Sequence, residues 1–176
     1  MSKKIGGSLT LLFMMLSVIT SSILWIRFGN IVFLQFFIIL IIATIGEHYV
    51  SGKGYYHYTE INGFFIGRVP LWIPLMWIVA IQGSYMFLIL LGFRTTEAIA
   101  LSGVICASAD FYFIEPLLSR RAGMWLWNSV NRGYFGFVPS RMNRFTAPVG
   151  NYVTWMVFPV IINAFLYYCS VVLPLI

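Results

Sequence analysis

The sequence predicts an all-α membrane protein, a bundle of about five transmembrane helices that forms a single integral membrane domain over residues 1–176. Of the 176 residues, 60% are hydrophobic and only 9% are charged, whereas about a quarter of the residues of a soluble domain are charged. Five apolar stretches each approach the length of about 20 residues that crosses a bilayer as a helix. These observations exclude a soluble domain.

The five predicted spans are separated by two long loops and two short links. The first span follows Lys3 and Lys4 and resembles a signal peptide, but its apolar run is too long and no small-residue cleavage site follows it. The fourth span is expected to end at Glu115, because Pro116 disfavours helix at the residue before it. The spans cover roughly residues 8–26, 30–45, 69–92, 96–114 and 150–173.

The distribution of Lys and Arg predicts the orientation, because cytoplasmic loops carry an excess of these residues. Only Arg27 and Arg94 fall on one side of the predicted bundle. We therefore expect the N-terminus and loops 46–68 and 115–149 on the cytoplasmic side of a prokaryotic cell membrane, and the C-terminus outside. Contact with anionic lipid heads then accounts for the net charge of +6, and no nucleic-acid partner is needed to explain it. The nine residues on the cytoplasmic side are Lys3, Lys4, Lys53, Arg68, Arg120, Arg121, Arg132, Arg141 and Arg144.

Carboxyl groups at membrane depth are the main candidates for chemistry. Glu47 and His48 follow the second apolar run, and Asp110 lies about one turn inside the fourth. Ionisable groups at this depth are costly and usually functional. With the predicted orientation Glu47, Asp110 and Glu115 lie at the same membrane face and can converge. On an α-helix, however, residues five apart point about 140° away from each other, so Asp110 and Glu115 share a face only if the helix kinks or stops there.

Aromatic side chains cluster in the same predicted loops. Tyr56, Tyr58, Trp125 and Trp127 could simply form an interfacial belt, but together with carboxyl groups they also suit protonation of an alkene. An acid would supply the proton, and the ring faces would stabilise the resulting carbocation. A second carboxylate would then hold the water molecule that captures the cation.

Other chemistries have no recognisable motif in the sequence. Cys106 and Cys169 form no C-x-x-C pair, and there is no nucleotide-binding loop or nucleophile turn. We therefore expect no cofactor and no metal. Two alternatives stay open: a single metal ion on Glu47, His48 and Asp110, and a purely structural role in which the acids of the fourth span pair with arginine.

The fifth predicted span carries amide and hydroxyl groups within an otherwise apolar run. Asn151, Thr154 and Asn163 fall in this span, and bare amides in a membrane are costly without partners. This pattern predicts that the fifth span packs against the site rather than against lipid alone.

Four short blocks, in order from about Gly46 to Trp155, have the pattern of a known family. The first is Glu47 with spaced glycines and tyrosines, and the second is the Val-Pro-Leu and Ile-Pro-Leu run of 69–77. The third is the acidic segment 110–116 with the paired tryptophans that follow it, and the last is the Pro-x-x-Asn-Tyr-x-x-Trp of 148–155. In these blocks the chain resembles the carotenoid biosynthesis membrane-protein family, whose characterised members are carotenoid end-group hydratases such as bisanhydrobacterioruberin hydratase.

The resemblance implies a membrane enzyme of isoprenoid or carotenoid metabolism, a hydro-lyase that hydrates an isoprenoid end-group double bond by acid catalysis. Asp110 or Glu115 would donate the proton and Glu47 would orient the water. The partners would be a lipophilic isoprenoid substrate and membrane lipids. Alternatives are a proton-initiated terpenoid cyclase or isomerase, and a non-catalytic lipid-binding subunit. The residues expected to bind the substrate are His48, Tyr56, Tyr58, Trp77, Trp125, Trp127 and Asn151.

Overall fold

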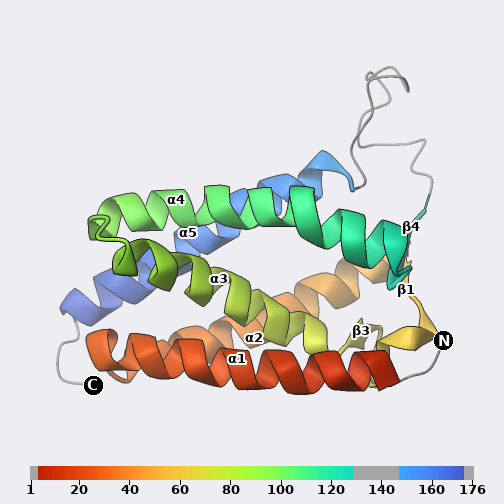
Figure 1. Ribbon diagram of the computed structural model, residues 1–176, viewed down its shortest axis with the longest axis horizontal. Coiled ribbons are helices and arrows are strands. Elements are labelled where there is room, and N and C mark those ends of the chain that lie inside the picture. Colours follow the sequence, from red (N-terminus) through yellow and green to blue (C-terminus); the bar gives the residue numbers. More distant parts are fainter. Residues whose placement is uncertain (1–3, 129–146, 173–176) are drawn as a thin grey trace.

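The protein is a bundle of five long helices, seen in a computed structural model that describes residues 4–128 and 147–172 (Figure 1). In this part of the chain all five helices are long and apolar enough to cross a membrane, which confirms the predicted fold class. Helix α1 begins and helix α5 ends at opposite ends of the bundle (Figure 1), as an odd number of spans requires. The helices are α1 (Lys4–Phe28), α2 (Ile31–Gly52), α3 (Trp72–Leu90), α4 (Thr95–Ala109) and α5 (Val149–Val172).

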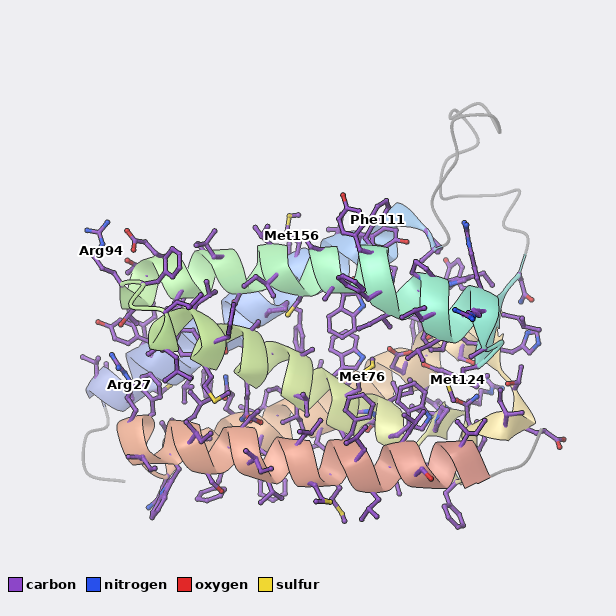
Figure 2. The ribbon with its side chains drawn as sticks, viewed as in Figure 1. Arg27, Met76, Arg94, Phe111, Met124 and Met156 are labelled. Atoms are coloured by element: carbon purple, nitrogen blue, oxygen red, sulfur yellow. The ribbon has the colours of Figure 1, made fainter. Side chains whose placement is uncertain are left out.

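One end of the bundle is closed by two tight turns. Gly29, with φ of 67°, joins α1 to α2, and Gly92, with φ of 87°, joins α3 to α4; both angles lie in the left-handed region that favours glycine. Arg94 starts α4 and forms an ion pair with Glu97. Arg27 and Arg94, the two basic residues predicted to lie apart from the rest, are both at this end (Figure 2). Of the other nine, Lys3, Arg132, Arg141 and Arg144 lie outside the described residues.

The other end of the bundle carries the long connections, which pair as short antiparallel strands. Strand β1 (Tyr56–Tyr58) pairs with β4 (Trp125–Trp127), and β2 (Phe65–Ile66) pairs with β3 (Val69–Pro70). A single turn of 3₁₀ helix, η1 (Glu60–Asn62), lies between β1 and β2. The sequence predicted loops here and no strands. The β1–β4 pair thus fixes the loop after α2 against the loop after α4 (Figure 1).

Helix α4 does not stop before Pro116, and the expectation that it ends at Glu115 is wrong. It continues without a break as a π-helix, η2 (Asp110–Arg121). In an α-helix, proline removes one hydrogen bond and crowds the carbonyl four residues earlier. A π-helix instead bonds each N–H to the carbonyl five residues earlier, so its wider turns accommodate Pro116. Such helices are rare and occur mostly as single turns at functional sites, and this one extends over 12 residues.

Helix α2 also continues beyond its predicted end at Ile45, reaching Gly52. Glu47 and His48 are therefore helical residues rather than loop residues. Successive residues on a helix point about 100° apart, since one turn takes 3.6 residues. The two side chains consequently leave α2 in different directions.

A chain of polar side chains joins all five helices in the middle of the bundle. Gln82 on α3 accepts a hydrogen bond from Ser21 on α1 at 2.8 Å and donates one to Gln35 on α2 at 3.1 Å. Gln35 donates to Asn163 on α5 at 3.1 Å, and Asn163 donates to Ser102 on α4 at 3.1 Å. Interhelical hydrogen bonds in membranes each contribute about 0.6 kcal/mol on average. The chain therefore fixes the relative register of the helices that carry the site.

Candidate functional site

Three carboxyl side chains line one small cavity at the end of the bundle that holds the β1–β4 pair. Glu47 comes from α2, and Asp110 and Glu115 come from η2. The cavity has a volume of about 30 Å³, enough for a water molecule. Its other lining residues are Tyr56, Tyr58, Ile73, Met76, Ile114, Trp125, Trp127, Asn151 and Trp155.

The π-helix places two of the acids on one face. Asp110 and Glu115 are both buried, each with 2% of its surface exposed. They are five residues apart, which is the hydrogen-bonding interval of a π-helix, so Glu115 lies about one turn beyond Asp110. On the α-helix that was expected, these side chains would have diverged. The irregular helix is thus the local cause of the paired acids.

Glu47 accepts hydrogen bonds from three aromatic side chains. Its Oε2 atom accepts one from the Tyr56 hydroxyl and one from the Tyr58 hydroxyl, the latter at 2.8 Å. Its Oε1 atom accepts one from Trp77 Nε1 at 3.1 Å. Burial, followed by the charge of Glu47, raises the pKa of Tyr56 and of Tyr58 above their usual range. Both phenols therefore keep their protons and stay hydrogen-bond donors at physiological pH.

Glu115 accepts hydrogen bonds from two indoles. Trp125 Nε1 donates to Oε1 at 3.1 Å, and Trp127 Nε1 donates to Oε2 at 2.9 Å. Alternate residues of a strand point to the same face, so a three-residue strand is enough to deliver both rings. In the β1–β4 pair Trp127 lies opposite Tyr56 and Trp125 opposite Tyr58. One small sheet thus supplies two donors to Glu47 and two to Glu115.

The position of β4 is itself fixed by hydrogen bonds. The Ser119 hydroxyl donates to the Trp125 carbonyl at 3.1 Å, which ties the strand to η2. The backbone N–H of Thr59 donates to the Met124 carbonyl at 3.0 Å, which ties it to the loop after β1. Gly123, with φ of 64°, makes the turn between η2 and the strand. Met124 is buried at this end of the bundle, in the same core cluster as Met76 (Figure 2).

Asp110 is the acid with the fewest hydrogen bonds. Among the described residues its side chain accepts a single hydrogen bond, on Oδ2 from Asn151 Nδ2 at 2.6 Å. This contact confirms that the fifth helix packs against the site, as the amides in its sequence predicted. In the described residues neither Asp110 nor Glu115 forms an ion pair with an arginine, since the one ion pair there is that of Arg94 with Glu97.

Most of the residues predicted for the site come together, with two differences. Trp77 donates a hydrogen bond to Glu47 but does not line the cavity. Its ring is stacked on Trp155, with ring centroids 4.4 Å apart. His48 is exposed and does not line the cavity; its Nδ1 accepts the backbone N–H of Arg68 at 3.4 Å. The predicted residues that line the cavity are Glu47, Asp110, Glu115, Tyr56, Tyr58, Trp125, Trp127 and Asn151.

Four cavity residues were not predicted. Ile73, Met76 and Ile114 are apolar residues within apolar spans, and no sequence pattern distinguishes them from lipid-facing neighbours. Trp155 had a signal, because it closes the last of the four sequence blocks. In the described residues no three His, Cys, Asp or Glu side chains lie in an arrangement that could hold a metal ion.

The chain matches a family model described as "carotenoid biosynthesis protein" over residues 6–172. The protein belongs to the carotenoid biosynthesis protein family. The match covers all five helices and every residue of the cavity, and it confirms the resemblance found in the four sequence blocks. Comparisons with curated proteins and with solved structures gave no match. Membership of the carotenoid biosynthesis family supports a role in carotenoid metabolism, and the apolar helices are consistent with a lipophilic isoprenoid substrate in the membrane.

Proposed function

We propose that the protein is a hydratase that adds water to an end-group double bond of a carotenoid or related isoprenoid within the membrane. The observation that carries this proposal is the water-sized cavity that is lined by three carboxyl groups and by several aromatic rings. Like charges in one low-dielectric site repel each other, so three carboxyl groups in one cavity favour a state in which at least one of them keeps its proton. A site of this kind suits an acid that carries a transferable proton.

Asp110 is the proposed proton donor. Both oxygens of Glu47 and both oxygens of Glu115 accept hydrogen bonds from O–H or N–H groups, which favours the form of a carboxyl that only accepts. Asp110 has Oδ2 bound to Asn151 and can carry a proton on Oδ1. In the reaction this proton moves to one alkene carbon, where the π electrons form the new C–H bond and leave a tertiary carbocation.

Glu47 is the proposed base for the water. Its Oε1 accepts one hydrogen bond, from Trp77, and a carboxylate oxygen has room for a second. The water oxygen forms the C–O bond to the cation, and one water proton passes to Glu47. Transfer of that proton from Glu47 to Asp110 then restores both acids. The sum is alkene plus water to alcohol, with no redox change. The rings of Tyr56, Trp125 and Trp127 can stabilise the cation by about 0.5–2 kcal/mol each.

Pigment analysis tests this function. The chain would be produced in a bacterial host that makes the acyclic carotenoid lycopene, beside the same host with an empty vector. We expect a more polar pigment whose mass exceeds that of its precursor by one water. A rearranged pigment of unchanged mass would instead indicate a cyclase or isomerase, and unchanged pigments would favour a lipid-binding subunit.

The orientation of the bundle forms part of the proposal. We place the carboxyl cavity near the cytoplasmic face of a prokaryotic cell membrane, because Lys53 and Arg68 lie at its end of the bundle and Arg27 and Arg94 at the other. A reporter that is active only in the cytoplasm should give a signal when fused at residue 3 or in loop 53–71. A reporter that is active only outside the cytoplasm should give a signal when fused at residue 92 or 176. The reverse pattern would contradict this orientation.

A further inference from the structure

A second, larger cavity opens between α2 and α5 beside the carboxyl groups. Its volume is about 330 Å³, within the range of about 300–1,000 Å³ that is common for small-molecule sites. We call it the α2–α5 cleft. It is lined by Ile42, Ala43, Gly46, Glu47, Val50, Tyr56, Trp77, Trp127, Gly150, Asn151, Thr154 and Phe158.

The α2–α5 cleft adjoins the carboxyl cavity. Four residues line both spaces: Glu47, Tyr56, Trp127 and Asn151. The polar groups therefore lie on the side of the cleft that borders the carboxyl cavity, and the rest of its wall is mainly apolar. A molecule with an apolar chain and a reactive end could place that end at the acids and its chain along the cleft.

Exposed apolar side chains of α2 and α5 lie on and next to the residues that line the α2–α5 cleft. Ile42, Ile45, Val153 and Val157 are 45%, 64%, 51% and 47% exposed, and all four belong to helices of spanning length. On such helices exposed apolar side chains contact lipid tails. These exposed residues favour access to the cleft from the lipid phase, in which isoprenoids dissolve.

Helix α5 packs very differently on its two sides. Toward α4 the helices are in close contact, because a Cβ atom added at Gly103 would lie 1.9 Å from the carbonyl oxygen of Met156, a residue labelled in Figure 2. Toward α2 there is open space at the level of Gly46, because a Cβ added at Gly46 would meet no atom within 4 Å. Gly46 has an ordinary helical backbone, so neither backbone conformation nor close helix packing requires glycine there. Its effect is to keep the cleft wide, although glycine costs a helix about 0.5–1 kcal/mol relative to alanine.

We propose that the α2–α5 cleft binds the isoprenoid chain of the substrate and admits it sideways from the membrane, with Gly46 leaving the width that the chain needs. This inference rests on the proposed function, since it takes the reacting end of the same substrate to lie at the acids. Beyond that function, the inference identifies the path by which the substrate reaches the acids and the part of the protein that selects the shape of its chain.

A binding experiment tests the cleft separately from catalysis. The protein would be placed in lipid nanodiscs and titrated with lycopene, with binding followed by quenching of tryptophan fluorescence. Trp77 and Trp127 line the cleft, so a bound polyene lies against two fluorophores. Gly46→Leu should weaken the apparent affinity at least tenfold, and Gly46→Ala should have a smaller effect because its methyl group leaves most of the cleft open.

The control is Gly7→Leu on α1, where an added Cβ also meets no atom within 4 Å and which supplies no residue to the cleft lining. It should bind as tightly as the unsubstituted protein. Thermal unfolding of each variant identifies any that fails to fold. If Gly46→Leu fails to fold, the affinity of Gly46→Ala is compared with that of the unsubstituted protein instead.

The outcomes separate the two proposals. If lycopene fails to quench the unsubstituted protein, the proposed substrate class is wrong and this inference falls with it. If lycopene binds and Gly46→Leu has no effect, only the cleft is overturned. The same holds if Ala80→Leu, which narrows a different cavity between α3 and α4, weakens binding while Gly46→Leu does not.

Discussion

Asp110→Asn should abolish product formation while leaving the fold nearly unchanged. The amide is almost isosteric with the acid and its oxygen can still accept the hydrogen bond from Asn151, but it has no proton to transfer. General acid catalysis contributes about 10² to 10⁴ in rate, so the product should fall below detection in the pigment assay. Thermal unfolding in detergent should show a midpoint close to that of the unsubstituted protein.

Glu97→Gln is the matched control for Asp110→Asn. Glu97 is an acid of the same helix, but it pairs with Arg94 at the opposite end of the bundle, so its removal should leave the product yield unchanged. Wild-type activity in both Asp110→Asn and Glu115→Gln would contradict acid catalysis. Product formation would then need a proton source other than these two acids.

Glu115→Gln should reduce both activity and stability, unlike Asp110→Asn. Glu115 receives an indole N–H on each oxygen, and a glutamine presents an NH₂ group in place of one oxygen. Either Trp125 or Trp127 then faces a donor, and a buried donor without a partner costs about 1–3 kcal/mol. The strand that carries both rings should loosen, and we expect at least a 10²-fold loss of product.

Measuring thermal stability together with activity tests whether Glu115 acts by holding the two indoles in place. Glu115→Gln should lower the unfolding midpoint by several degrees, since about 1 kcal/mol shifts it by roughly 2–4 °C in a domain of this size. Glu60→Gln is the control, because Glu60 lies exposed in η1 and should be neutral in both assays. A Glu115→Gln protein with full stability and full activity would show that the indole contacts do not organise the site.

Hydropathy predicted the number of helices, because an apolar run of spanning length is a local property of the sequence. The number and order of the spans then predicted the convergence of the acids. The bilayer sets the length of each apolar run. The convergence of Glu47 with Asp110 then follows from the antiparallel order of the spans. The amide of Asn151 likewise signalled a polar partner, although the sequence did not say which.

The details of the site could not be predicted, because they depend on structure that sequence periodicity does not encode. An α-helix is the default geometry, and nothing in residues 110–121 indicates hydrogen bonds five residues apart. Strands β1 and β4 are three residues each and pair across a long separation, so neither carries a strand pattern of its own. The exposure of His48 follows from the two extra turns of α2, which place it about 100° around the helix from Glu47.

The β1–β4 pair has a consequence for how the protein is made. Glu47 is synthesised early, with the second helix, and its phenols follow within a few residues. The indoles that complete the sheet are synthesised only after the fourth helix, and Asn151 only with the fifth. A growing chain therefore contains the proposed water-binding acid, Glu47, well before the proposed proton donor, Asp110. The carboxyl cavity is complete only when the last helix joins the others, so the proposed activity would report that assembly in the membrane is complete.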